Sequence, residues 1–216
     1  MVRIKICGIT TPEDAILAVE SGADAIGLVF ARSPRQVTVR QARQIVAALP
    51  PFFPAVGVFV NARAATVLRT VADVGLSAVQ LHGDESADYP AKLGGIRTIK
   101  ALRVRDRAFV EQVRAFREAG VSAILLDAFS PKARGGSGKR FDWDLVVGAR
   151  DAGALENAPS LILAGGLTSE NVAAGIRRLH PWGVDVSSGV EESPGVKSAE
   201  KIVRFIAAAR SASSRA

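Results

Sequence analysis

Residues 4–30 read IKICGITTPEDAILAVESGADAIGLVF, and this stretch decides the fold. It contains two short apolar runs, Ile4–Cys7 and Ala25–Phe30, which are rich in the Val, Ile and Leu typical of buried parallel strands. Between them Thr11 precedes Pro12 and two acidic residues, a pattern that indicates the start of a helix. A strand, a helix and a second strand in this order predict two parallel strands joined by a crossover helix.

The same unit recurs along the whole chain. Helical spacing of apolar residues is found at Val39–Leu49, Phe109–Phe116 and Ile202–Ile206, and Thr168 with Glu170 signals another helix start. The 216 residues divided by eight units give 27 residues each, enough for a strand, a helix and two short loops. The eight predicted strands are Ile4–Cys7, Ala25–Phe30, Ala55–Val60, Ala78–Leu81, Thr98–Leu102, Ala123–Leu126, Leu161–Ala164 and Gly183–Val186.

We therefore predict an α/β fold, a parallel eight-stranded (β/α)₈ barrel of the TIM type. It is expected to form a single domain over residues 1–210, with residues 211–216 as a frayed C-terminal tail. A doubly wound open sheet is the competing architecture. It is disfavoured because Cys7-Gly8-Ile9-Thr10 follows the first strand, where a dinucleotide-binding sheet has Gly-x-Gly-x-x-Gly.

Composition excludes several classes of protein. The chain is 48% hydrophobic, yet no apolar run reaches the about 20 residues of a membrane-spanning helix, and residues 1–8 lack the apolar core of a secretion signal. We therefore expect a cytoplasmic protein that does not bind membranes. One cysteine and two histidines, His82 and His180, argue against a Cys/His zinc site, and we expect no bound metal. The net charge of +7 comes from scattered basic residues and aromatics are only 6%, so small anionic substrates are expected rather than nucleic acid.

In a barrel of this type, reactive side chains lie at the C-terminal ends of the strands. The two-residue period of the first strand directs Ile4 and Ile6 toward the helices and Lys5 and Cys7 into the lumen. Cys7 stands at the end of that strand. It is either a packed small hydrophobe or, in an electropositive site, a thiolate that can act as base or nucleophile.

Carboxyl groups end two further strands. Asp127 follows the sixth apolar run and Asp185 lies within the eighth. Each is either an acid whose pKa is raised by burial or a member of an ion pair, for example with Lys5 or Lys100. On the fourth strand Gln80 shares a face with His82, which is either a hydrogen-bonding wall residue or a proton carrier.

Three loops are suited to binding an anionic ligand. Glycine-rich turns follow the seventh and eighth strands, where barrels of this type bind phosphate through backbone N–H groups. A longer loop, 128–142, is either a lid or merely a solvated basic loop. Arg32 and Arg35 follow the second strand, and either could clamp a carboxylate. The predicted phosphate-binding residues are Gly165, Gly166, Ser187, Ser188 and Gly189.

Five motifs, in the same order along the chain as in a known enzyme family, carry a resemblance. They are Lys5-Ile6-Cys7-Gly8-Ile9-Thr10, Val56-Gly57-Val58-Phe59-Val60-Asn61, Val79-Gln80-Leu81-His82-Gly83, Gly135-Gly136-Ser137-Gly138-Lys139-Arg140-Phe141-Asp142-Trp143 and Asp185-Val186-Ser187-Ser188-Gly189-Val190-Glu191. On these motifs the chain resembles the phosphoribosylanthranilate isomerases of tryptophan biosynthesis along nearly its whole length. The resemblance implies an Amadori rearrangement of N-(5-phosphoribosyl)anthranilate to 1-(2-carboxyphenylamino)-1-deoxyribulose 5-phosphate, without a metal or an organic cofactor.

The resemblance also implies roles for individual residues. Asp127 would protonate the ring oxygen of the ribose, and Cys7 would remove the proton from the carbon next to the former anomeric centre. Arg35 would hold the anthranilate carboxylate, the two glycine-rich turns would bind phosphate, and His82 and Asp185 would contact the rest of the substrate. A monomer is the default expectation, and a homodimer is the alternative.

Two departures and two rival interpretations remain at this point. Ala128 stands beside Asp127 where a hydroxyl residue is often found in the family, and Arg32 competes with Arg35 for the carboxylate. Another phosphate-binding barrel is the nearest rival, but an epimerase would need metal ligands and an indole-glycerol-phosphate synthase a lysine in place of Cys7. A catalytically silent sensor of phosphorylated ligands is the other rival, and it would not need Cys7 or Asp127.

Overall fold

The computed structural model describes residues 1–128 and 141–213, and in it eight parallel strands form a closed barrel. Each strand is hydrogen-bonded to its neighbours in sequence, and the first strand pairs with the last, which excludes the open sheet. The predicted fold class is thereby confirmed. The strands are β1 (Arg3–Cys7), β2 (Ala25–Val29), β3 (Ala55–Phe59), β4 (Ala78–Leu81), β5 (Thr98–Val104), β6 (Ala123–Ala128), β7 (Ser160–Leu163) and β8 (Gly183–Val186).

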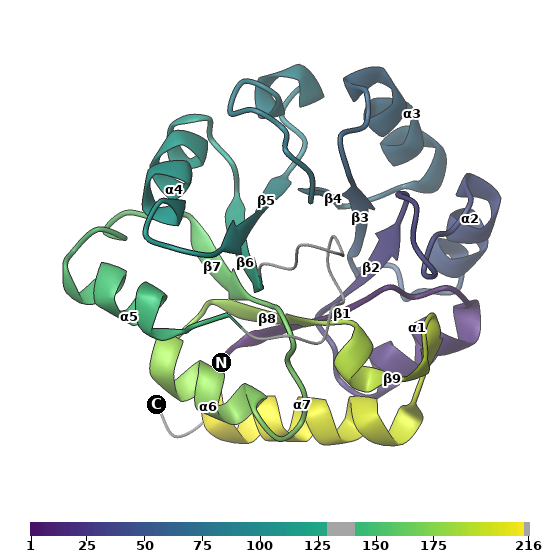
Figure 1. Cartoon of the computed structure of the whole chain (residues 1–216). Helices are drawn as coiled ribbons and strands as arrows, with labels where there is room; N and C mark the ends of the chain where they lie inside the picture. The colour runs from purple at the N-terminus through teal and green to yellow at the C-terminus, as the bar shows by residue number, and fades with distance from the viewer. Residues whose placement is uncertain (129–140, 214–216) are drawn as a thin grey trace.

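Helices surround the barrel on its outer side (Figure 1). A two-stranded sheet of β9 (Glu191–Ser193) and β10 (Val196–Lys197) follows β8. In the described part of the chain no helix is both long and apolar enough to cross a membrane. The helices are α1 (Pro12–Glu20), α2 (Val39–Ala47), α3 (Ala64–Val74), η1 (Pro90–Leu93), α4 (Phe109–Glu118), α5 (Asp144–Asp151), α6 (Val172–Leu179), η2 (Ser188–Val190) and α7 (Ala199–Ser213).

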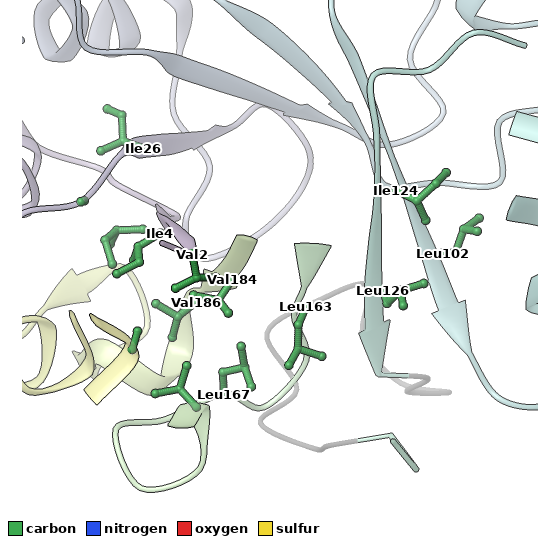
Figure 2. Packing of buried hydrophobic residues seen from close by; sticks show 14 of the residues in the cluster. Val2, Ile4, Ile26, Leu102, Ile124, Leu126, Leu163, Leu167, Val184 and Val186 are labelled. Atoms are coloured by element: carbon green, nitrogen blue, oxygen red, sulfur yellow. The ribbon is translucent and has the colours of Figure 1, made fainter. Parts of the chain in front are cut away.

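Alternate residues of the strands supply two separate apolar layers. The larger layer fills the space between strands and helices, and Figure 2 shows Ile4, Val184 and Val186 of the adjoining strands β1 and β8 within it. A small second cluster, which includes Ala123 and Leu125, fills the lower lumen. On β6 the same period brings Asp127 into the lumen above Leu125, because side chains two residues apart share a face. The period of β6 therefore places the carboxyl group of Asp127 at the C-terminal end of the lumen, above the apolar cluster.

Three local expectations need correction. Helix α6 begins at Val172, not at Thr168, because the Asn171 side chain ties the preceding residues into a turn by accepting from the Thr168 N–H and donating to the Gly166 carbonyl. The fourth unit has only the short helix η1, and left-handed glycines follow it directly. Strand β5 continues two residues beyond Leu102 because it stays paired with the end of β6.

The predicted C-terminal tail and the predicted lid both extend beyond the described residues. Helix α7 continues through Ser213, whose hydroxyl accepts a hydrogen bond of 2.7 Å from the Val2 N–H. A frayed tail over residues 211–216 stays a prediction, since residues 214–216 lie outside the described part of the chain. The predicted lid over residues 128–142 also falls largely outside it, at residues 129–140.

The start of α2 provides a test of how far a local motif stabilises the barrel. Thr38 accepts from the Gln41 N–H, and the Gln41 side chain accepts from the Thr38 N–H, which forms a complete capping box. We expect Thr38→Ala to lower the free energy of unfolding by about 1 kcal/mol, measured by urea denaturation. Thr66→Ala, at an exposed position in α3 without a capping role, is the matched control and should leave stability unchanged or slightly raised. Equal losses of unfolding free energy in both variants would contradict the capping role of Thr38.

Candidate active site

A cavity of about 490 Å³ opens at the C-terminal ends of the barrel strands. Strands β1, β4, β6 and β8 and the loops after β2, β7 and β8 line it together. All of the side chains and turns predicted from sequence as catalytic or binding residues border this one cavity, namely Cys7, Arg35, His82, Asp127, Gly165, Gly166, Asp185, Ser187, Ser188 and Gly189. The topology thus brings together residues that are up to 182 positions apart, counted from Cys7 to Gly189.

Cys7 ends β1 with its side chain in the lumen, as predicted. Gly27 on the neighbouring strand leaves room for the sulfur, because a Cβ at that position would lie 2.7 Å from Cys7 Sγ. Burial raises the pKa of the Cys7 thiol, and the Asp185 carboxylate adds to this, while Lys5 and Lys197 work in the opposite direction. The cations do not fully offset the burial, so the thiol form predominates at neutral pH in the unliganded site.

Lys5 and Asp185 form a buried ion pair across the β1–β8 junction. Lys5 Nζ lies 2.7 Å from Asp185 Oδ1 and also donates to Gln80 Oε1 at 3.1 Å. Burial opposes the charge on Lys5, but Asp185 and Cys7 outweigh it and leave the pKa of the ammonium raised. Of the two alternatives for Asp185, the structure therefore shows the ion pair.

Asp127 ends β6 and is held through both carboxyl oxygens. Oδ1 accepts from the Ala128 N–H at 2.7 Å, and Oδ2 lies 3.0 Å from His82 Nε2. Gly165 must be a glycine here, because it has a φ of +79° and a Cβ would lie 2.9 Å from Asp127 Oδ1. Although residue 128 is an alanine without a hydroxyl group, both oxygens of the Asp127 carboxyl group have partners, the Ala128 N–H and His82.

The two glycine-rich turns pack against each other at the rim of the cavity. Gly165 and Gly166 both have left-handed backbone, with φ of +79° and +63°. A Cβ on Gly189 would collide with the carbonyl oxygen of Leu167, so the loops after β7 and β8 approach closely only because this residue is glycine. Beside them the Ser187 hydroxyl is buried and has no hydrogen-bond partner among the described residues. This corner offers a free hydroxyl and close-lying backbone to an anion.

Arg35 reaches the cavity, but part of its guanidinium is already engaged. Nε and Nη2 donate to the two carboxylate oxygens of Glu191 at 2.7 and 2.6 Å. These hydrogen bonds raise the pKa of Arg35. Nη1 has no partner in the described part of the chain and is the nitrogen left for a ligand. Arg32 also lines the cavity and is exposed.

Lys197 is a buried cation beneath the site that was not predicted from the sequence. The Lys197 side chain is fully buried in β10, and its Nζ donates to the carbonyl oxygens of Cys7 and Ser187 and to Glu191 Oε1 at 2.7, 3.2 and 2.8 Å. It ties the end of β1 to the loop after β8. No local pattern around Lys197 distinguishes it from a surface lysine, whereas Glu191 lies in one of the quoted motifs.

Lys100 has a different role from the one considered. Its side chain faces α4, donates to Glu85 Oε2 at 2.6 Å and lies over the ring of Phe116. It therefore pairs with neither lumen carboxylate. Among residues 1–128 and 141–213, no group of three or more His, Cys, Asp or Glu side chains is placed to hold a metal ion.

Comparison with known proteins gives a consistent result. The family model of N-(5'phosphoribosyl)anthranilate (PRA) isomerase matches residues 4–208. N-(5'-phosphoribosyl)anthranilate isomerase of Pelobacter propionicus is 52% identical over 211 residues, which cover 97% of this chain and 96% of that protein.

Two crystal structures extend the comparison to the fold. One shows monomers of a dimeric phosphoribosylanthranilate isomerase from Thermotoga maritima, with 41% identity and a TM-score of 0.85 over 98% of this chain and 100% of that one. Another isomerase of the family is in complex with reduced 1-(o-carboxyphenylamino)-1-deoxyribulose 5-phosphate, with 43% identity and a TM-score of 0.85 over the same shares of the two chains.

The single cysteine allows a direct test of the charges around Cys7. Alkylation requires the thiolate, so a raised pKa slows the reaction of Cys7 with iodoacetamide at neutral pH. Lys5→Met removes a cation that lowers this pKa and should slow alkylation further, whereas Asp185→Asn removes a carboxylate that raises it and should accelerate alkylation. A change of half a pKa unit gives about a threefold change in rate at fixed pH. Rates that move in the same direction in both variants would contradict this account, and the urea-unfolded proteins provide the reference rate.

Proposed function

This chain belongs to the N-(5'-phosphoribosyl)anthranilate isomerase family, and we propose that Cys7 and Asp127 are the base and the acid of its reaction. The enzyme converts N-(5'-phosphoribosyl)anthranilate to 1-(2-carboxyphenylamino)-1-deoxyribulose 5-phosphate in tryptophan biosynthesis. One observation carries the assignment of roles. A thiol from β1 and a carboxyl group from β6 border the same cavity, with a cation beside the thiol and with the Ala128 N–H and the His82 ring beside the carboxyl group.

The rearrangement requires that one proton is delivered to the ring oxygen and that another is removed from C2, two atoms that are both bonded to C1. Asp127 gives its proton to the ring oxygen, the C1–O bond breaks, and the nitrogen lone pair forms a protonated Schiff base at C1. Cys7, as thiolate, removes the proton from C2, and the C–H electrons form the C1=C2 bond of the enolamine. C1 then takes up a proton while the 2-hydroxyl group releases one, which gives the ketone and leaves the atoms balanced.

The charges around Cys7 explain how a buried thiol serves as the base. Burial favours the neutral thiol, and the Lys5 ammonium favours the thiolate by charge and hydrogen bonding. The protonated Schiff base adds a second positive charge to the site as soon as the ring has opened. The thiolate form of Cys7 is therefore favoured further at the step in which the C2 proton must leave.

The remaining walls of the cavity match the parts of the substrate. Nη1 of Arg35 is placed to bind the anthranilate carboxylate, and Phe30, which stacks on Phe59 with ring centroids 5.1 Å apart, offers an apolar face to the aromatic ring. His82 and Asp185, which also line the cavity, are assigned to the sugar hydroxyls. The turns at 165–166 and 187–189 bind phosphate through backbone N–H groups and serine hydroxyls. Arg32, which is exposed, is assigned the secondary role of attracting the anion.

Several sequence-based expectations complete the proposal. We take residues 1–210 as one barrel domain of a cytoplasmic enzyme that needs no cofactor and binds neither nucleic acid nor membranes. We take the enzyme as a monomer. The dimeric relative from Thermotoga maritima makes a homodimer the alternative, and sedimentation equilibrium distinguishes the two.

Removal of either proton-transfer group should stop turnover but not binding. We expect Cys7→Ala and Asp127→Asn each to lower kcat by about 10²–10⁴-fold, the usual contribution of one acid or base. Turnover is followed by the loss of anthranilate fluorescence, and binding of the reduced product analogue by calorimetry. Asp73→Asn, at an exposed position on α3, is the control and should retain full activity. Near-normal rates in both site variants would remove the proposed mechanism.

The phosphate group should contribute to catalysis and not only to affinity. Binding energy from a remote part of the substrate positions the reacting carbon, so a substrate without phosphate should lose kcat/KM by orders of magnitude. Gly189→Ala forces apart the two turns and should lower kcat/KM for the phosphorylated substrate while it changes that for the phosphate-free substrate little. Equal efficiency with both substrates in the unaltered enzyme would exclude a phosphate site at these turns.

A further inference from the structure

A chain of hydrogen bonds in the lumen connects the surroundings of Cys7 with those of Asp127. Lys5 Nζ donates to Gln80 Oε1 at 3.1 Å, Gln80 Nε2 lies 2.9 Å from His82 Nδ1, and His82 Nε2 lies 3.0 Å from Asp127 Oδ2. The members come from β1, β4 and β6, and Gln80 in the middle is only 1% exposed. Water is therefore a poor substitute for any of its protein partners.

The chemistry of Lys5 determines the direction of every bond in this chain. An ammonium group has only donors, so the Gln80 oxygen must face Lys5 and the Gln80 NH₂ group must face His82. His82 Nδ1 must then accept with its lone pair, which leaves the ring proton on Nε2, directed at Asp127. The reverse orientation of Gln80 would place two donors opposite each other at Lys5.

The charge on Lys5 is itself secured by its surroundings. Asp185 Oδ1 lies 2.7 Å from Nζ, and the pair is buried. Although burial opposes the ammonium, the carboxylate outweighs it and leaves the pKa of Lys5 raised. Lys5 thus stays a donor at the pH at which the enzyme works, and the orientation of Gln80 does not reverse.

We propose that Gln80 is a positioning residue that holds His82 as the neutral Nε2–H tautomer, so that Asp127 faces an N–H group and not a cation. The proposal rests on the proposed role of Asp127 as the acid. The imidazolium form of His82 is disfavoured by the same geometry, because its Nδ1–H would point at the Gln80 NH₂ group.

The requirement follows from the opposite needs of the acid and the base. The base is helped by a cation, because positive charge favours the thiolate. A cation near the acid has the opposite effect. An imidazolium 3.0 Å from Asp127 would favour its carboxylate form, in which Asp127 has no proton to donate. Gln80, an uncharged amide between Lys5 and His82, keeps the positive charge at the Cys7 end of the chain. After Asp127 has released its proton, the His82 N–H remains to stabilise the carboxylate.

The ring nitrogens of His82 can be observed directly because the chain has only two histidines. Nitrogen-15 NMR of the unliganded protein with labelled imidazole rings distinguishes the two neutral tautomers and the imidazolium. We expect the His82 signals of the Nε2–H tautomer alone, and the signals of exposed His180 provide an internal reference within the same spectra. A proton on His82 Nδ1, or a mixture of tautomers, would overturn the proposal without the need for a variant.

Two substitutions test the link between the tautomer and catalysis. Gln80→Glu presents an acceptor to both neighbours and should move a proton onto His82 Nδ1, whereas Gln80→Met removes both bonds and should release a mixture of tautomers. Each should lower kcat by about 10- to 100-fold, the usual cost of losing a group that orients a histidine. Gln112→Glu, at an exposed position on α4, is the matched control and should leave kcat and the His82 signals unchanged.

The outcomes separate this proposal from the function on which it rests. If the His82 tautomer changes as expected and kcat does not, Gln80 has no positioning role in catalysis. If Asp127→Asn remains active, the assignment of the acid fails, while the tautomer measured in the unaltered protein still tests the hydrogen-bond chain by itself.

Discussion

The ion pair of Lys5 and Asp185 determines how the polar groups of the lumen are arranged. Its two charges are buried at the junction of the first and last strands, so each needs the other, and removal of one partner from such a pair costs about 3–5 kcal/mol. Lys5 also donates a hydrogen bond to Gln80 Oε1, and this bond determines the orientation of the Gln80 amide. The thiol and the carboxyl group of the site both depend on this single cation, the first by charge and the second through Gln80 and His82.

The barrel separates these polar groups from the groups that stabilise it. Small and branched apolar side chains form one cluster in the lumen, and the larger apolar layer lies outside the strands, under the helices. The polar side chains Cys7, Gln80, Asp127 and Asp185 enter the lumen toward the C-terminal ends of their strands and line the cavity. A second pair of charges, Lys197 with Glu191, supports the rim from behind by joining the end of β1 to the loop after β8 and by engaging Arg35. The side chains that we propose to bind substrate thus have orientations that are set by contacts within the protein.

Periodic features of the chain were predictable from sequence, and features that depend on a distant partner were not. The eight strands and the inward direction of Lys5 and Cys7 follow from alternation alone, and every predicted site residue borders the one cavity because parallel strands end at a common edge. The predicted start of α6 at Thr168 was wrong, because the Asn171 side chain holds the preceding residues in a turn through hydrogen bonds to Thr168 and Gly166. The contact of Lys197 with the Cys7 carbonyl and the pairing of Arg35 with Glu191 were not predicted, because the partners are 190 and 156 positions apart and no local pattern specifies either contact.

Closure of the barrel by its last strand has a consequence for how the protein folds. β1 pairs with β8 as its second neighbour, and Lys5 and its partner Asp185 are 180 positions apart in the sequence. A nascent chain therefore carries an unpaired edge of β1 until β8 has been synthesised. Such non-local contacts slow folding and expose intermediates to aggregation. Fragments that end before β8 should be ligands for chaperones, and the thiol acquires its electrostatic surroundings only in the final step of assembly.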